Sequence, residues 1–345
     1  MKRLGFSSYT SGLVAATVML AGCAGPQPPA GVTGEIPQPA ALARRLDSGR
    51  SWMLPAAKSM RRLLYVSDSW SSDVYVYDYA SRRLVGILSG FTTPAGQCVD
   101  RHGNIWITEF SGIQVFEYAH GGSTPIRTLT TGAQYSFGCS VDPKTGNLAV
   151  ANDGNSGTIP GQVLLFKDAS GVPISYQNGH CLELSSPGYD DKGNLYVEGG
   201  SYQTNDVCRL PHGGATLGLV SSNQLIYAPG SVMWDGQYIT LEDNEYKGNR
   251  NTAIYQMQEA TGGNLTLVGT VQLNDDCGSD EFIAQPFILG RSNTPRNRKQ
   301  GYSVVGSNAD CKSKVDFWSY PAGGDLVPLI MAPKEPDGQS VSVAP

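Results

Sequence analysis

A short pattern that recurs through the chain constrains its fold more than any other feature. In its clearest copy, Pro94 to Gly122, three β-strand patterns at Ala95 to Asp100, Asn104 to Glu109 and Ile113 to Tyr118 are separated by Gly-containing turns. Variants of the middle strand begin at residues 64, 105, 148, 195, 238 and 302, at intervals of 41, 43, 47, 43 and 64 residues. A period near 40 residues is typical of four-stranded blades, so the sequence predicts an all-β, six-bladed β-propeller.

The C-terminal segment supplies a strand that the first blade lacks. Innermost strands elsewhere tend to begin with Pro or an aromatic residue followed by Gly, whereas only a linker precedes Leu64. Pro336 to Val341 repeats the spacing of Pro94 to Val99, so we expect it to complete the first blade and close the ring. Closure removes the exposed sheet edges of an open stack. The predicted propeller covers residues 61–345.

Composition agrees with an all-β fold and limits the function. The chain of 345 residues has 42 Gly and 21 Pro, only 16% of its residues are charged, and no stretch shows sustained helical periodicity. Its net charge of -5 gives no support to nucleic-acid binding. The sequence has neither a Gly-rich phosphate loop nor a zinc-spaced Cys/His cluster.

The N-terminus predicts export. Lys2 and Arg3 precede the apolar run Leu13 to Ala21, which is too short to span a bilayer comfortably, and small residues precede Cys23. An ordinary secretory signal or a transmembrane helix is the alternative, but the pattern resembles a bacterial lipoprotein signal peptide with its lipobox. The resemblance implies a signal peptide over residues 1–22 and lipidation of Cys23. The following segment is rich in Pro, Ala and Gly and lacks a strand pattern, so residues 23–60 are predicted to be the lipidated Cys and a flexible tether. Ala24 favours the outer membrane or cell surface over the inner membrane.

Six cysteines remain after Cys23, and an even number in an exported chain favours disulfides over six buried thiols. Cys98 and Cys139 lie on the innermost strands of neighbouring blades, one alignment position apart. Adjacent sheets face each other with opposite surfaces, and a one-residue offset reverses the direction of a side chain. This parity allows Cys98 to pair with Cys139.

The other four cysteines are paired by their places in the repeat. Cys277 and Cys311 fall in loops expected at the same end of the last blade, so we pair them. Cys181 then pairs with Cys208, by elimination and because their placement is similar.

Polar side chains end the second strand in four blades. Asp68, Glu109, Asn152 and Glu242 align at equivalent positions and should converge on the upper mouth of the channel. The upper face carries the loops that enter the innermost strands and those between the second and third strands. Oxygen ligands from several blades suit Ca²⁺, which makes a Ca²⁺ site one hypothesis. The alternative is that polar residues simply end exposed strands.

The repeat also predicts opposite charges on the two faces. Many acidic residues, including Asp153, Glu198 and Asp243, fall on the upper face. The lower face receives a set of basic residues: Arg82, Arg83, Arg101, His102, Lys144, Lys192, Arg291, Arg296, Arg298 and Lys299. We therefore expect an electrical asymmetry across the disc.

Histidines and tryptophans give weaker signals. His102, His120 and His212 fall in lower-face turns and are predicted to be turn residues rather than catalytic bases. Tryptophans could stack on sugars, but Trp106 and Trp318 occupy strand positions that usually pack between blades, so we predict core positions for them.

Val99 to Ile107, followed by Ile113 to Phe116, resembles the repeat of NHL-type six-bladed propellers. The broader superfamily includes calcium-dependent lactonases of the SMP-30 type, and Gly103 to Glu109 also resembles a repeat of virginiamycin B lyase. The resemblance implies the fold more firmly than a function, because such propellers include scaffolds, binding proteins and enzymes.

The leading interpretation is a non-enzymatic module, anchored by lipid in the bacterial cell envelope, that binds an envelope protein or carbohydrate through its upper face. No catalytic residue and no required cofactor is predicted, although Ca²⁺ remains a candidate ligand. One alternative is a metal-dependent hydrolase, lactonase-like, or a lyase at the channel mouth. The other is a structural envelope component.

Overall fold

The computed structural model describes residues 49–154, 160–200, 205–245, 252–260, 262–274, 283–289, 302–308, 313–331 and 334–345. The chain divides into two units, residues 1–38 and 39–345, and every described residue belongs to the second. Cys23, Cys277, Cys311 and the basic insertion at 291–299 lie outside the described residues. Within the described ranges, no helix has the length and apolarity needed to cross a membrane.

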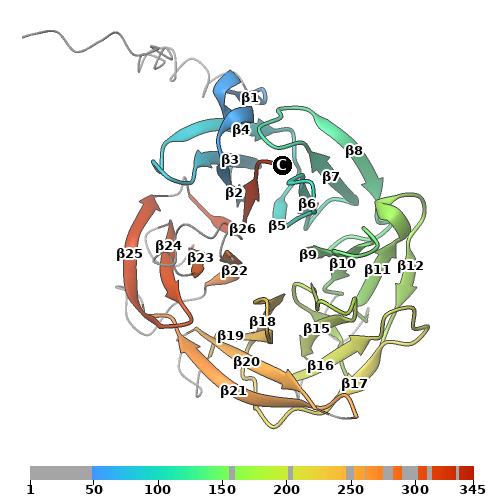
Figure 1. Cartoon of the computed structure of the whole chain (residues 1–345). Helices are drawn as coiled ribbons and strands as arrows, with labels where there is room; N and C mark the ends of the chain where they lie inside the picture. The colour runs from blue at the N-terminus through green and yellow to red at the C-terminus, as the bar shows by residue number, and fades with distance from the viewer. Residues whose placement is uncertain are drawn as a thin grey trace, which may run out of the picture. The chain divides into compact units, whose positions relative to one another are not determined.

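Six antiparallel sheets are arranged as blades around a central axis (Figure 1). The strands of the first three blades, from the axis outward, are as follows. Blade 1 contains β26 (Pro336–Val343), β2 (Arg62–Asp68), β3 (Asp73–Asp78), β4 (Leu84–Ser89) and β1 (Trp52–Met53). Blade 2 contains β5 (Pro94–Val99), β6 (Ile105–Glu109), β7 (Gln114–Tyr118) and β8 (Pro125–Thr130). Blade 3 contains β9 (Ser136–Val141), β10 (Leu148–Asn152), β11 (Gln162–Phe166) and β12 (Ile174–Tyr176).

The other three blades follow in chain order. In blade 4, β13 (Glu183–Leu184) and β14 (Gly188–Tyr189) both pair with β15 (Leu195–Gly200), followed by β16 (Asn205–Leu210) and β17 (Gly218–Val220). Blade 5 contains β18 (Pro229–Trp234), β19 (Ile239–Asp243), β20 (Ala253–Glu259) and β21 (Leu265–Gln272). Blade 6 contains β22 (Ala284–Leu289), β23 (Tyr302–Asn308), β24 (Lys314–Tyr320) and β25 (Gly323–Met331). Two 3-10 turns, η1 (Pro55–Ser59) and η2 (Lys167–Ala169), are the helical elements of the described chain.

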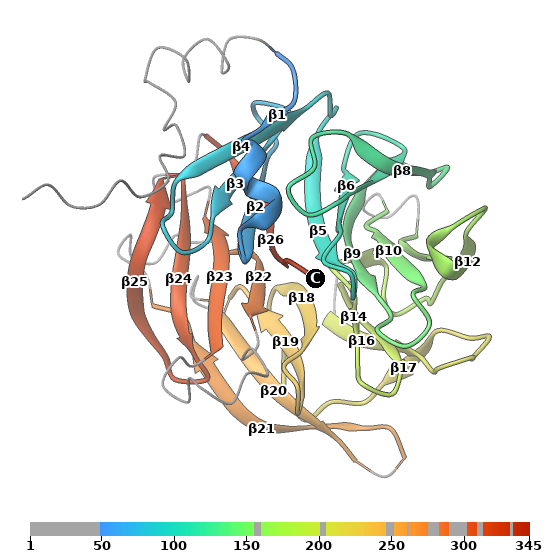
Figure 2. The same cartoon turned by 45° about the horizontal axis from the view of Figure 1, so that its top comes forward.

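The C-terminal strand closes the ring, as the sequence predicts. β26 runs antiparallel to β2, with paired positions from Arg62 opposite Val343 to Asp68 opposite Pro336. Figure 2 shows β26 between β2 and the axis. The predicted six-bladed propeller and its closure are confirmed.

The end of the predicted tether belongs to the folded body instead. Trp52 and Met53 form β1 at the outer edge of blade 1, opposite Ile87 and Gly86 of β4. Ala57 in η1 is fully buried. Apolar side chains at the end of this Pro- and Ala-rich segment cover the outside of the blade, and their burial favours this docking over a solvated linker.

Apolar side chains fill the spaces between neighbouring blades. Tyr65 of blade 1 belongs to the same buried cluster as Ile105 and Ile107 of blade 2. Trp106 and Trp318 are almost completely buried, which confirms their predicted place in the core.

Two disulfides reinforce the described chain. Cys98 of β5 is bonded to Cys139 of β9, with 5.5 Å between their Cα atoms, so this bond links blades 2 and 3. Cys181 is bonded to Cys208 of β16, with a Cα separation of 6.4 Å. Both predicted pairings are confirmed, including the one that rested on strand parity.

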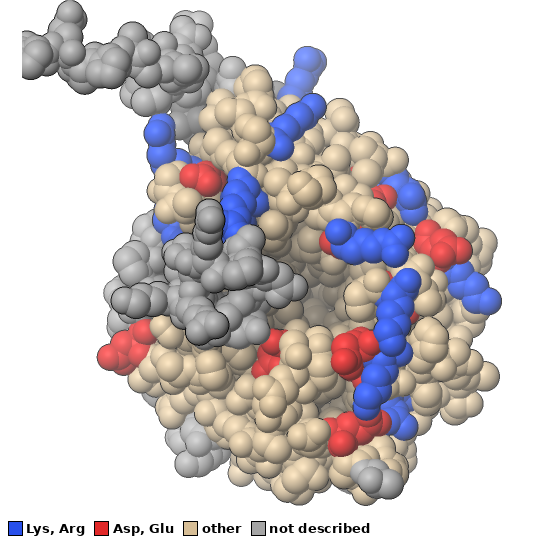
Figure 3. Space-filling view, viewed as in Figure 1, with Lys and Arg blue, Asp and Glu red and all other residues tan. Residues whose placement is uncertain are grey.

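The lower face carries carboxylates that the charge prediction did not place there. Asp100, Asp142, Asp190 and Asp235 each follow the innermost strand of a blade, and each accepts hydrogen bonds from backbone amides of the next turn. Their short side chains stabilise these turns. Figure 3, which views the face where the chain ends, shows acidic as well as basic side chains around a central hollow. The predicted separation of charge is therefore incomplete.

His120 joins three separate segments at the ring closure. Its Nε2 donates to the carbonyl oxygen of Met60 at 2.8 Å, and its Nδ1 lies 2.6 Å from Oγ of Ser342 in β26. The side chain is buried, so the interpretation as an ordinary turn residue missed its contacts. These contacts come from residues 60 and 222 positions away, which a turn pattern does not reveal.

We expect His120→Ala to lower the free energy of unfolding by about 2 kcal/mol, because buried hydrogen-bonding groups lose their partner. Burial lowers the pKa of His120, and the Met60 carbonyl only partly opposes this effect. As the pH falls, His120 is therefore protonated in the unfolded chain before it is protonated in the folded chain. Its contribution to the free energy of unfolding should weaken below about pH 6.5. Urea unfolding between pH 5 and pH 8 tests both effects, with exposed His102→Ala as the control. Equal stability of the two variants would contradict a stabilising role for the His120 contacts.

Candidate functional site

Strand register identifies the equivalent positions at the upper ends of the second strands. Glu109 lies opposite Pro94, Asn152 opposite Ser136, and Asp68 opposite Pro336. In blade 5 the residue opposite Pro229 is Asp243. The predicted equivalence of Glu242 with the other three candidates is therefore wrong by one residue, because the second strand of blade 5 begins at Ile239, and Tyr238 belongs to the preceding turn, where its carbonyl accepts from the amide of Asp235.

The four equivalent side chains bind the loops that enter their own innermost strands. Oδ2 of Asp68 accepts from the amides of Lys334 and Glu335, and Oε1 of Glu109 accepts from that of Thr92.

The other two blades repeat this arrangement. Nδ2 of Asn152 donates to the carbonyl oxygen of Gln134, and Oδ1 of Asp243 accepts from the amides of Tyr227 and Ala228. The polar strand ends thus have a structural role. Over the described residues, no three His, Cys, Asp or Glu side chains lie close enough to hold a metal, and Ca²⁺ binding stays a prediction.

Glu198 and Glu242 form a buried carboxyl pair between blades 4 and 5. Oε2 of Glu198 accepts from the amide of Gly230 at 2.8 Å, and Oε2 of Glu242 accepts from the next amide, that of Ser231. The regular pairing of β18 with β19 is interrupted between Pro229 and Val232. The amides of Gly230 and Ser231 therefore donate to the two carboxyl groups instead. Burial raises the pKa of Glu242 to about 8, and burial together with the Glu242 charge raises the pKa of Glu198 well above its usual value. The pair therefore favours protonated carboxyl groups.

A side chain of blade 6 crosses the central axis. Gln285 donates from Nε2 to the carbonyl oxygen of Phe137 in blade 3, at 3.0 Å. Blades 3 and 6 lie opposite each other in the ring (Figure 1). Gly96 of blade 2 is needed beside this crossing, because a Cβ there would lie 2.5 Å from Oε1 of Gln285. Gln285 thus joins blade 6 to blade 3 across the axis.

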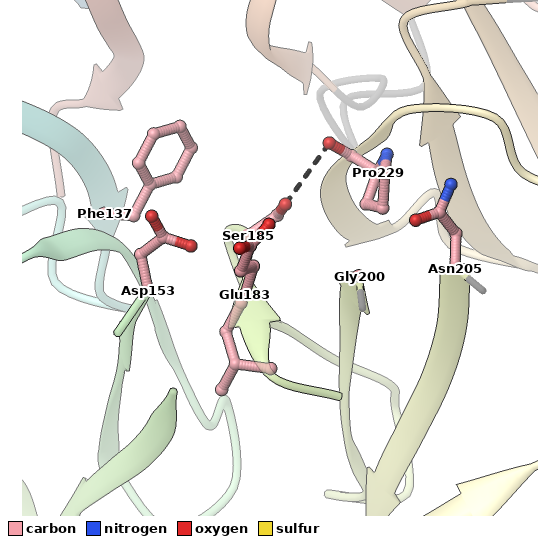
Figure 4. A pocket seen from close by; sticks show the side chains of 8 residues that line it. Phe137, Asp153, Glu183, Ser185, Gly200, Asn205 and Pro229 are labelled. Carbon is pink, nitrogen blue, oxygen red and sulfur yellow. Dashed lines mark hydrogen bonds between the residues drawn. The ribbon is translucent and has the colours of Figure 1, made fainter. Parts of the chain in front are cut away.

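A cleft of about 240 Å³ opens above this crossing, between blades 3, 4 and 5. Figure 4 shows Asp153 and Phe137 on one side, Glu183 and Ser185 between, and Asn205 on the other side. Oγ of Ser185 donates to the carbonyl oxygen of Pro229 at 3.3 Å.

Asp153 has a raised pKa within this cleft. Burial, followed by the nearby charge of Glu183, raises the pKa of Asp153 to about 6. The side-chain amide of Asn205 donates from Nδ2 to the carbonyl oxygens of Ile226 and Tyr227, and its Oδ1 lies on the side of Gly200. The described cleft therefore offers mainly oxygen acceptors. The sequence placed Asp153 on the acidic upper face, but only the fold brings Glu183 and Asn205 beside it.

These observations define the chain as a six-bladed β-propeller closed by its C-terminal strand, with a cleft on its upper face. No family model matches the sequence, and no curated protein matches it.

Solved propeller structures are similar to the chain in fold. A crystal structure of a nidogen/laminin complex contains a chain with 10% identity and a TM-score of 0.59, covering 82% of this chain and 98% of that one. Hydrazine synthase from Kuenenia stuttgartiensis has 12% identity and a TM-score of 0.53, covering 79% and 84%. A Bacteroides caccae protein of unknown function has 15% identity and a TM-score of 0.54, covering 82% and 99%. At these identities the similarity concerns the fold alone.

Proposed function

We propose that this propeller is a non-enzymatic binding module, anchored to the bacterial envelope through a lipidated Cys23, which binds an envelope protein through its upper face. The propeller fold supports a binding role, and one similar fold occurs in the nidogen/laminin complex. The single observation that carries the choice of face is the cleft in which Asp153 and Glu183 lie close enough to interact electrostatically.

The chemistry of the cleft favours a Lys or Arg side chain of the partner. Asp153 and Glu183 supply negative charge, and Oδ1 of Asn205 supplies an additional acceptor. Phe137 adds an aromatic ring, on which a cation can pack. A guanidinium or ammonium group has only donors, so it complements a wall of acceptors. A carbohydrate partner would have to satisfy the same acceptors through its hydroxyl groups.

We expect Asp153→Asn to weaken binding of a lysine- and arginine-rich peptide by roughly tenfold, the usual scale for losing one charge-assisted hydrogen bond. Because the pKa of Asp153 is about 6, wild-type binding should decrease as the pH falls through 6. This decrease should be smaller in the variant. Isothermal titration at pH 5 and pH 7.5 measures both effects.

Asp191→Asn is the matched control, because it removes the same charge from an exposed lower-face turn. An acidic peptide of the same length should not bind. If Asp153→Asn and Asp191→Asn bind the basic peptide equally, the upper cleft is not the binding site. If instead only Asp153→Asn loses affinity for the basic peptide, envelope proteins that are captured by wild type and not by Asp153→Asn are candidates for the natural partner.

A further inference from the structure

The lower half of the axis contains a second cavity, separate from the upper cleft. Its volume is about 270 Å³, and it is lined by the ends of the innermost strands. Gln285 lines this cavity and donates to the carbonyl oxygen of Phe137, and the cavity shares no described lining residue with the upper cleft. Figure 3 shows a hollow at the centre of the lower face. The cavity therefore opens on the opposite side from the proposed partner site.

Aromatic and apolar side chains line the walls of this cavity. Tyr189, Trp234 and Phe287 come from blades 4, 5 and 6, and Trp234 and Phe287 are half-buried. None of the described lining residues carries a charge. Burial further raises the pKa of Tyr189, so its phenol stays neutral. Aromatic and apolar walls of this kind favour packing against the face of an uncharged ring over binding of an ion.

Among the described residues, two buried polar atoms at the cavity lack a hydrogen-bond partner. Gln97 donates from Nε2 to Oγ of Ser67 at 2.8 Å, but its Oε1 is unpaired among the described residues. Oγ of Ser186 is also buried and without a hydrogen bond to any described group. Both side chains are more than nine-tenths buried and line the cavity.

Unpaired polar atoms of this kind define the polarity of a ligand. An unpaired buried acceptor is costly, so a bound group that donates to Oε1 of Gln97 would be favoured. The Ser186 hydroxyl can donate or accept. Hydroxyl groups satisfy both requirements at once, whereas an ion would be placed in a cavity whose described walls offer no opposite charge.

We propose that the lower cavity binds a neutral, hydroxylated ring of monosaccharide size, whose hydroxyl groups pair with Gln97 and Ser186 while its ring packs against Trp234. The ligand would enter from the lower face. This binding is independent of the upper cleft, because none of these three residues lines that cleft.

Titration of the full chain with methyl β-D-glucopyranoside, followed by tryptophan fluorescence and NMR, tests the proposal. We expect saturable binding in the millimolar range and much weaker binding of glucuronate and glucosamine. Ser186→Ala should weaken glucoside binding roughly fivefold, because one hydrogen bond to the ligand is lost. Its melting temperature should not fall, since the hydroxyl has no described protein partner to lose.

Trp234→Phe should reduce the fluorescence response, and Trp234→Ala should weaken binding roughly fivefold. Exposed Trp70→Ala is the control and should bind as wild type does. The absence of glucoside binding would overturn the proposal, as would equal binding by wild type, Ser186→Ala and Trp234→Ala. Preferential binding of glucuronate or glucosamine would overturn the neutral ligand class.

Discussion

Removal of residues 336–345 should abolish the cooperative thermal transition of the propeller. The deletion removes β26, which pairs with β2 along the whole length of β2. It also removes Val341, which belongs to the buried cluster between blades 1 and 6. Both edges of the broken ring would be exposed. We expect the deletion to remove most of the free energy of unfolding, which is typically about 5–15 kcal/mol for a folded domain.

Circular dichroism and calorimetry measure this loss directly. Removal of Pro345 alone is the matched control, because β26 ends at Val343 and the amide of Ala344 still donates to the carbonyl of Arg61. We expect this control to melt as the intact chain does. A sharp transition near the wild-type temperature in the chain that ends at Glu335 would show that β26 is dispensable for closure.

Glu242→Gln should stabilise the propeller at alkaline pH. The pKa of Glu242 rises from 4.5 to about 8 on folding because the side chain is buried. The folded chain therefore retains a proton that the unfolded chain releases, so stability is greatest below about pH 4.5 and falls as the pH rises toward 8. A single proton gives a slope of about 1.4 kcal/mol per pH unit.

The side-chain amide introduced by Glu242→Gln would keep an oxygen for the Ser231 amide without requiring a proton. We expect a gain of about 3 kcal/mol at pH 8 and little change at pH 5, measured by urea unfolding. Glu198→Gln should act in the same direction, because Glu198 shares this buried site. Glu245→Gln, in the exposed part of the following loop, should leave the pH slope unchanged. A wild-type slope in Glu242→Gln would contradict the protonated pair.

The blades were predictable because each hairpin is local. Alternating apolar residues and Gly-containing turns identify the strands around Ile105, and the repeat spacing then places their counterparts. The match of Pro336 to Val341 with Pro94 to Val99 extended this reasoning to ring closure. Parity along a strand was enough to pair Cys98 with Cys139, since side-chain direction alternates at every residue.

The same parity explains the error in blade 5. Tyr238 prolongs the apolar pattern of the second strand but lies in the turn before it, so an alignment that starts the strand at Tyr238 exchanges the roles of Glu242 and Asp243. The cleft residues Asp153 and Glu183, and the contacts of His120, depend on segments distant in sequence. Such contacts arise from packing of the whole ring and leave no periodic signal in the chain.

The Gln285 side chain ties opposite sides of the ring together. Its hydrogen bond to the carbonyl oxygen of Phe137 joins blade 6 directly to blade 3, without passing through the blades between them. A displacement of blade 6 relative to blade 3 must therefore stretch or break this bond, so the contact should resist distortion of the ring across its centre.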